Sequence, residues 1–162
     1  MDKQDLIAQL RAQLEATARA ARATHEAAAV EARDGATPDE KREDARAAHQ
    51  LGTIGGAQAR RARQAQAEAD ALASFRPEAA LARIAVGAIV EIEDDERNEG
   101  RTFFLAPAGA GITLTGPGGD GLLSVVTPQS PIGKAVIGRR AGEVVDVTVD
   151  GELREWQITY VA

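Results

Sequence analysis

Residues 130–161 read SPIGKAVIGRRAGEVVDVTVDGELREWQITYV, and this stretch decides the fold of the second half of the chain. Ser130 is a good helix N-cap, Pro131 suits the first helical position, and Gly138 can end a short helix. Beyond that helix, apolar and polar residues alternate on both sides of Asp150-Gly151. Because Asp-Gly favours a tight two-residue turn, the stretch predicts a short helix followed by a β-hairpin.

The same alternation extends upstream and indicates a β-rich domain. Gly- and Asp-rich turns separate the alternating segments. The predicted strands are 88–93, 101–106, 112–115, 122–127, 144–149 and 153–161. The charged run 94–99 is interpreted as a solvated turn. Trp156 and Tyr160 lie four residues apart in a strand, so we expect them on one face.

Further upstream the period changes to that of a helix. Residues 4–33 contain neither glycine nor proline, and leucines recur every four residues at Leu6, Leu10 and Leu14. Alanines continue the same side of the helix. These alanines are Ala18, Ala21, Ala28 and Ala32. Thirty helical residues correspond to a rod of about 45 Å.

A second helix is predicted from about residue 38 to about residue 75. Thr37 and Glu40 form a capping box, and Pro38 suits the first helical position. The connection after Gly35, a natural helix end, is so short that the two helices must be antiparallel. Small residues form a seam along the second helix. They are Ala45, Ala48, Ala59, Ala62 and Ala69, with Leu72.

Three glycines interrupt the second helix, at Gly52, Gly55 and Gly56. Each costs about 1 kcal/mol relative to alanine in a helix. They mark either a bend or a place where another group packs against the backbone, and close packing is the slightly favoured interpretation.

The composition excludes several classes of protein. The chain has no cysteine, so it forms no disulfide and no thiolate metal site. The first residues, MDKQDLIAQL, lack the pattern of a signal peptide, and no apolar run approaches the roughly 20 residues of a membrane span. We therefore expect a cytoplasmic protein with no membrane association, and we expect a monomer.

The net charge of −6 is unevenly distributed. Residues 1–76 hold 12 basic and 12 acidic side chains and are neutral overall. Residues 77–162 hold 7 basic and 13 acidic side chains, so they carry the whole net charge. Phosphate backbones repel an acidic surface. We therefore expect no independent nucleic-acid binding, and a basic protein surface is the better candidate for a partner of the second half.

The residues described above resemble the Gre family of bacterial transcript-cleavage factors, GreA and GreB. The resemblance combines a helical hairpin with a particular C-terminal motif. The motif consists of Ser130-Pro131-Ile132, Ala135, Ile137-Gly138, Gly142-Glu143-Val144-Val145, Glu155 and Ile158. Glu31-Ala32-Arg33 before the hairpin tip also resembles the family.

The resemblance implies an α+β protein with two domains. Residues 1–76 would form an antiparallel coiled-coil hairpin with an acidic tip near 34–44, and residues 77–162 an FKBP-like antiparallel β domain with one short helix. The β domain would dock at the secondary channel of RNA polymerase through Ser130, Pro131 and Ile132, while the hairpin enters the channel. Because the catalytic site belongs to the polymerase, the chain itself is not expected to be an enzyme.

The resemblance also implies a role for the tip carboxylates. Asp39, Glu40, Glu43 and Asp44 would assist the polymerase in cleaving backtracked RNA. Mg²⁺ prefers oxygen ligands and usually takes only one or two carboxylates. Glu40 and Asp44 share a helical face, so they are the candidate ligands of a Mg²⁺ shared with the polymerase, and no cofactor of the chain's own is expected.

A structural explanation of the same acids stays open. Glu40 belongs to the capping box, and acids near a helix N-terminus are stabilised by the helix dipole. The tip sequence DGATPDEKRED departs from the family's usual tip, and Lys41 and Arg42 lie inside the acidic cluster. A regulator or inhibitor that occupies the channel without promoting cleavage is therefore the alternative function.

Two more remote functions complete the set. An FKBP-like domain could be a prolyl isomerase, although its aromatic-lined pocket would have few side chains to draw on. Those side chains are Phe103, Phe104, Trp156 and Tyr160. A coiled-coil adaptor without a polymerase contact would fit the neutral charge of the hairpin.

Overall fold

The structure is a computed structural model of the chain. It describes residues 3–34, 44–116, 121–149 and 151–162, and side chains of 32–51 and of 149 are outside the description. None of the helices within these ranges combines the length and the apolar character that a bilayer-spanning segment requires.

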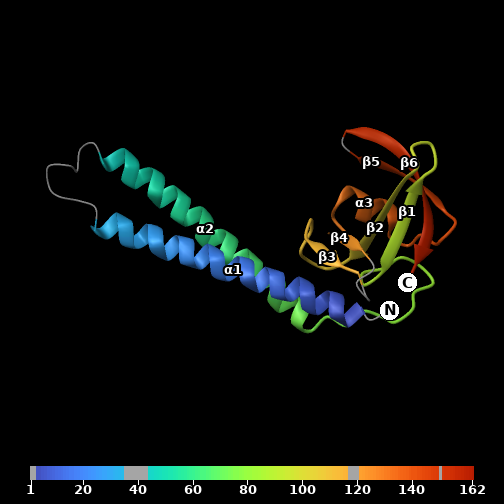
Figure 1. Ribbon diagram of the computed structural model, residues 1–162, viewed down its shortest axis with the longest axis horizontal. Coiled ribbons are helices and arrows are strands. Elements are labelled where there is room, and N and C mark those ends of the chain that lie inside the picture. Colours follow the sequence, from blue (N-terminus) through green and yellow to red (C-terminus); the bar gives the residue numbers. More distant parts are fainter. Residues whose placement is uncertain (1–2, 35–43, 117–120, 150) are drawn as a thin grey trace. The chain divides into compact units, whose positions relative to one another are not determined.

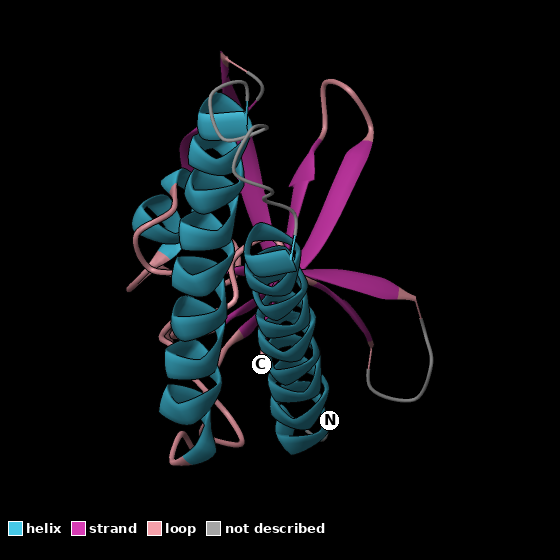
Figure 2. Ribbon diagram, turned by 90° about the vertical axis from the view of Figure 1, so that its left-hand side faces the viewer, coloured by secondary structure: helices cyan, strands magenta, loops and turns pink. Residues whose placement is uncertain are grey.

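Two long helices form the first part of the chain, α1 (Lys3–Asp34) and α2 (Asp44–Ala73). They lie side by side in both ribbon views (Figures 1 and 2). Arg22 Nη2 donates to Gln66 Oε1 at 2.8 Å, and His25 Nδ1 lies 2.9 Å from Gly55 O, so the helices are antiparallel. The predicted hairpin is confirmed, while the predicted caps at Gly35 and Thr37–Glu40 lie outside the described residues.

The helices pack through the predicted small-residue seam. Its buried members are Leu6, Leu10, Leu14, Ala18 and Ala21 in α1, and Ala62, Ala69 and Leu72 in α2. Ala65, which was not predicted, is buried beside them, and the predicted Ala28 and Ala59 are half-buried. Alanine side chains allow two helix backbones to approach closely, and close approach increases the dispersion contacts that each small side chain makes. The side chains of Ala32, Ala45 and Ala48 lie outside the description.

The glycines of α2 differ in their surroundings. The helix continues unbroken through all three of them. A Cβ atom added at Gly55 would lie 3.4 Å from His25 Nδ1, whereas one added at Gly52 would meet nothing within 4 Å. Of the three glycines, Gly55 is therefore the one that packs against the other helix, with the histidine ring at van der Waals distance from the position of an added Cβ atom.

The chain divides into two compact units, Ala12–Asp70 and Met1–Arg11 with Ala71–Ala162. The first turns of α1 therefore belong with the sheet. This division reflects which residues contact one another. The domain boundary predicted between residues 76 and 77 was based on a change of sequence period, and it stays a prediction.

A six-stranded sheet with strand order β3-β4-β2-β1-β6-β5 forms the centre of the second unit. Its strands are β1 (Ile89–Asp94), β2 (Glu99–Leu105), β3 (Thr113–Thr115), β4 (Leu122–Val126), β5 (Val144–Val149) and β6 (Glu152–Val161). All six predicted strands are present, and the α+β class is confirmed. One neighbouring pair, β2 and β4, is parallel and the others are antiparallel, so the sheet is mixed.

One face of the sheet, here called the core face, packs beneath the short helix α3 (Pro131–Val136). Its buried side chains include Val90, Ile92, Phe103, Val136, Val145, Val147, Trp156 and Ile158. Trp156 is completely buried, and the guanidinium of Arg101 lies 5.6 Å from the centre of its ring. A cation over an indole face adds a favourable electrostatic contact.

The opposite face, here called the outer face, is covered at β3, β4 and β2. The first turns of α1 reach this region: the Gln9 amide donates to Thr115 O and accepts from Thr115 N, at 3.2 and 3.0 Å. Leu10 leaves no room for a side chain at Gly109. The buried outer-face residues are Ile89, Phe104, Leu114, Leu123 and Val125. The outer face of β1, β6 and β5 remains exposed.

An irregularity in the pairing of β1 with β6 corrects one prediction. Ile92 pairs with Ile158, but the preceding residue, Glu91, pairs with Tyr160, so one residue of β6 bulges out. A bulge reverses the alternation of side chains beyond it. Trp156 therefore points to the core face and Tyr160, which is 39% exposed, to the outer face. The prediction that they share a face is wrong.

Candidate functional site

The predicted tip site lies almost entirely outside the described residues. Asp39, Glu40 and Glu43 fall in the undescribed range, and Asp44 begins α2 with its side chain undescribed. Within the described part of the chain, no group of three or more His, Cys, Asp or Glu side chains is placed to hold a metal ion. The catalytic and Mg²⁺-binding roles of the tip stay predictions.

The predicted partner-binding segment, Ser130–Ile132, lies at the start of α3. Ser130 is the N-cap, with its Oγ accepting from Gly133 N at 3.0 Å and donating to Thr127 O at 2.8 Å. Pro131 occupies the first turn, as predicted. Ser130 and Pro131 therefore position the helix, and the side chain of Ile132 is left half-buried at its edge.

Gly133 is a residue that the sequence analysis did not identify. A Cβ atom at this position would lie 2.0 Å from Thr127 O, a contact that no side chain can make. The first turn of α3 consequently packs directly on the backbone of the preceding turn. This contact holds Ile132 next to the sheet.

An open groove lies beside Ile132 on the core face of β2 and β4. It has a volume of about 330 Å³ and is lined by Gly100, Arg101, Thr102, Phe103, Leu122, Ser124, Val126 and Ile132. Helix α3 packs mainly against β5, at the far edge of the sheet, and Ile132 is the α3 residue that reaches the groove. Leu122 is 73% exposed there. Two consecutive leucines in an alternating strand place one of them outside the core, and Leu122-Leu123 is such a pair.

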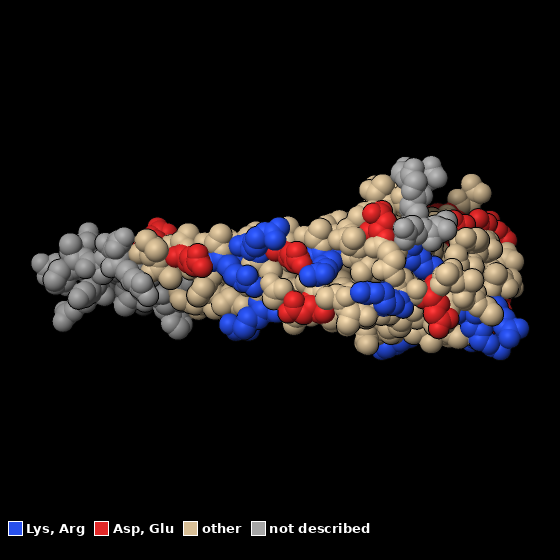
Figure 3. All heavy atoms as spheres, turned by 90° about the horizontal axis from the view of Figure 1, so that it is seen from below, with Lys and Arg blue, Asp and Glu red and all other residues tan. Residues whose placement is uncertain are grey.

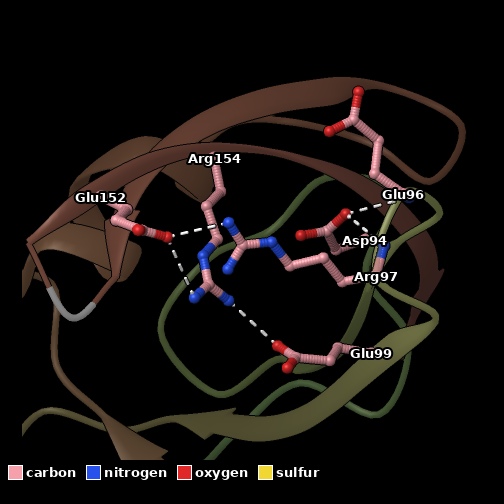
Figure 4. A network of polar contacts seen from close by, with 6 residues as sticks. All are labelled: Asp94, Glu96, Arg97, Glu99, Glu152 and Arg154. Atoms are coloured by element: carbon pink, nitrogen blue, oxygen red, sulfur yellow. Dashed lines mark hydrogen bonds and ion pairs between the residues drawn. The ribbon is translucent and has the colours of Figure 1, made fainter.

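A network of ion pairs lies at the β1–β2 turn and the β5–β6 hairpin (Figure 4). Arg97 pairs with Glu152 at 2.9 Å, and Arg154 pairs with Glu99 at 3.0 Å and with Glu152 at 3.5 Å. The hydrogen bond from Arg97, followed by its charge, lowers the pKa of Glu152, and the same hydrogen bond raises the pKa of Arg97. The network joins the β1–β2 turn to the β5–β6 hairpin.

Asp94 shows that the predicted solvated turn is shorter than expected. Its carboxylate accepts from the backbone nitrogens of Glu96 and Arg97, at 3.1 and 3.3 Å, and the residue is buried. Such a contact is typical of Asp at the start of a turn. The exposed turn is therefore confined to the residues between β1 and β2.

Charges on the described part of the helical hairpin are mixed. Lys, Arg, Asp and Glu side chains alternate along the face of the hairpin in Figure 3. Such an arrangement is typical of a solvated helix surface. It agrees with the neutral charge of the first half.

Solved structures of other proteins are similar to this chain. The chain is similar in structure to the transcription factor Gfh1, with 21% identity, a TM-score of 0.41, and coverage of 96% of this chain and 92% of that one. It is also similar to GreA factor homolog 1 (Gfh1) of Thermus thermophilus, with 19% identity, a TM-score of 0.41, and coverage of 96% and 94%. Thermus aquaticus Gfh1 is similar as well, with 22% identity, a TM-score of 0.40, and coverage of 94% of this chain and 90% of that one. The comparison with curated proteins finds no match.

The family model described as transcription elongation factor, GreA/GreB, C-terminal, matches residues 79–162, which are 84 of the 162 residues. The chain therefore belongs to the GreA/GreB family of transcription elongation factors. Members of this family act on RNA polymerase and are not enzymes themselves. The resemblance derived from residues 130–161 is confirmed.

Proposed function

We propose that this protein binds RNA polymerase, inserts its helical hairpin into the secondary channel and stimulates cleavage of backtracked RNA. The observation that carries the proposal is the family match over residues 79–162. The hairpin supplies the means, because its two helices are long, antiparallel and joined by a segment rich in carboxylates.

The length of the hairpin supports insertion. At 1.5 Å per residue, the 32 residues of α1 span about 48 Å. The hairpin seam is buried from Leu14 to Ala21 and from Ala62 to Ala69, so the described arm is a packed pair of helices. A packed pair can carry its connecting segment deep into a partner.

The chemistry of the tip fits assistance to a metal-dependent cleavage. Glu40 and Asp44 would be the ligands of a Mg²⁺ shared with the polymerase, and their oxygens are the ligand type that Mg²⁺ prefers. When bound, such an ion would stabilise the charge that develops on the oxygens of the scissile phosphate. Asp39 and Glu43 would add negative charge beside it.

The groove beside α3 supports the docking role of Ser130–Ile132. Half-buried Ile132 and exposed Leu122 both line the groove and offer apolar contact area. Arg101 lies among the lining residues and offers a positive charge. A partner helix with one or two apolar side chains and a carboxylate would match this arrangement.

A channel regulator that does not promote cleavage is the second candidate. The observation that favours it is the presence of Lys41 and Arg42 between the tip acids. Two positive charges within an acidic cluster weaken its attraction for a cation. In that case the arm would occupy the channel and slow entry of nucleotides or escape from pauses.

A cleavage assay on a stalled elongation complex separates the two functions. We expect the protein to accelerate Mg²⁺-dependent shortening of backtracked RNA. The variant Glu40→Ala plus Asp44→Ala should cleave at least about 100-fold more slowly than the unaltered protein. The estimate follows because a metal ion contributes several kcal/mol and each factor of ten in rate corresponds to about 1.4 kcal/mol.

The matched control is Glu26→Ala plus Asp70→Ala, which removes two exposed carboxylates from the arm itself. This variant should cleave as the unaltered protein does. Polymerase binding without any cleavage, over a range of Mg²⁺ concentrations, would leave the regulator as the function. Absence of binding to core polymerase at low salt would contradict both candidates.

A further inference from the structure

The exposed half of the outer face carries an unbalanced charge. The strand register places Glu155 of β6 directly opposite Asp146 of β5, and Glu93 of β1 in one row with Gln157 and Val144. Like charges opposite one another on neighbouring strands destabilise a sheet. The pair Asp146–Glu155 therefore lowers folding stability, and folding alone gives no reason for its position.

A hollow of about 400 Å³ opens between this face and the β1–β2 turn. Six carboxylates line it: Glu93, Asp94, Asp95, Glu96, Asp146 and Glu155. Only two cationic side chains, Arg97 and Arg154, are among its described lining residues, and both are paired with carboxylates that do not line the hollow. The hollow therefore keeps an excess of negative charge.

Apolar side chains lie among these acids. Val144 and Leu153 line the hollow and are 49% and 73% exposed. Tyr160, shifted to this face by the bulge, is 39% exposed. Lysine and arginine match such a surface, because their hydrocarbon stems pack on apolar groups while their charged ends reach carboxylates.

A metal ion is a poorer match for this hollow. Within the described residues, no three His, Cys, Asp or Glu side chains are placed to hold one. The acids are spread along a sheet face and a turn, and exposed apolar groups lie between them. Spacing of this kind fits several cationic side chains on one protein segment.

We propose that the hollow lined by Glu93, Asp146 and Glu155 is a second docking site for RNA polymerase, separate from the α3 groove, and that it receives a segment bearing lysine and arginine. The inference rests on the proposed polymerase binding. The occupant follows from charge complementarity together with the exposed Val144 and Leu153, which contact the stems of the basic side chains.

The test measures binding of the full-length protein to core RNA polymerase over a range of salt concentrations. We expect Asp146→Asn plus Glu155→Gln to raise the dissociation constant about 10-fold at low salt, mainly through a slower association rate. The difference should shrink as salt rises, because screening weakens interactions between exposed charges. The substitutions relieve the repulsion between the two carboxylates, so the variant should fold at least as stably as the unaltered protein.

Two control variants make every outcome decisive. Asp5→Asn plus Glu78→Gln changes the net charge by the same amount at two exposed positions of the sheet unit that line neither the hollow nor the α3 groove, and this variant should bind normally. Equal weakening by this control would overturn the inference, because a general charge effect would then explain the result.

Ile132→Ala separates this inference from the proposed function. Weakening by Ile132→Ala, with normal binding by Asp146→Asn plus Glu155→Gln, would overturn the second site alone. Failure of the unaltered protein to bind polymerase would overturn both proposals.

Discussion

The helical arm and the sheet bury apolar surface in opposite ways. Between Ala12 and Asp70 the buried side chains are mostly alanines, such as Ala18 and Ala65, whereas the core face of the sheet is built around Trp156 and Phe103. A small side chain contributes little burial of its own, so the arm depends on close backbone approach and on helix propensity. A large side chain contributes through its area, so the sheet depends on a few residues.

Trp156→Ala should have the largest effect on stability. Removing a completely buried tryptophan should cost about 3–5 kcal/mol, because the cavity that it leaves cannot collapse fully. Chemical denaturation followed by far-UV circular dichroism measures the loss. The control is Tyr160→Ala in the same strand, which should cost less than about 1 kcal/mol because Tyr160 is partly exposed. Equal losses would contradict the bulge.

Ala62→Leu tests whether the arm depends on close approach. Ala62 is 4% exposed, and three extra carbons in the seam should cost about 1–3 kcal/mol. Alanine and leucine have similar helix propensities, so the cost would come from packing. Ala57→Leu, at an exposed position of the same helix, is the matched control and should change thermal stability little. If Ala62→Leu caused no loss of stability, the seam would be loosely packed and the arm would not depend on close approach of its helices.

The glycines of α2 provide the smallest and most specific test. Gly52→Ala should stabilise the helix by about 0.5–1 kcal/mol, since its added Cβ meets nothing within 4 Å. Gly55→Ala should gain less, because its Cβ would lie 3.4 Å from His25 Nδ1. A thermal unfolding series of the two variants compares them directly. A larger gain at Gly55 would show that the histidine contact imposes no constraint.

Local patterns were sufficient to predict most of the elements. The four-residue spacing of Leu6, Leu10 and Leu14 predicts α1, and alternation predicts all six strands, because both signals repeat over several residues. Signals of one or two residues were less informative. Glycine at position 55 could mean a bend or a close contact, and only the position of His25 on the other helix distinguishes them.

The candidate site was predictable in part for the same reason. Ser130 and Pro131 form a helix start that can be recognised in the sequence, and the structure confirms their capping geometry. Gly133 was missed, because its closest contact is the backbone of Thr127 rather than a patterned side chain. The groove was missed as well, since its walls come from β2, β4 and α3, which are distant in the chain.

The sequence alone determined the helical arm, the order of strands along the chain, the start of α3 and the family, because each depends on residues near one another in the chain. Tertiary structure decided which strands are neighbours, including the parallel pair β2–β4, and which face Tyr160 occupies. It also brought Asp146 and Glu155 together beside the β1–β2 turn. Strand pairing joins residues that are far apart in sequence, and the register that places them depends on hydrogen bonding and packing across the whole sheet.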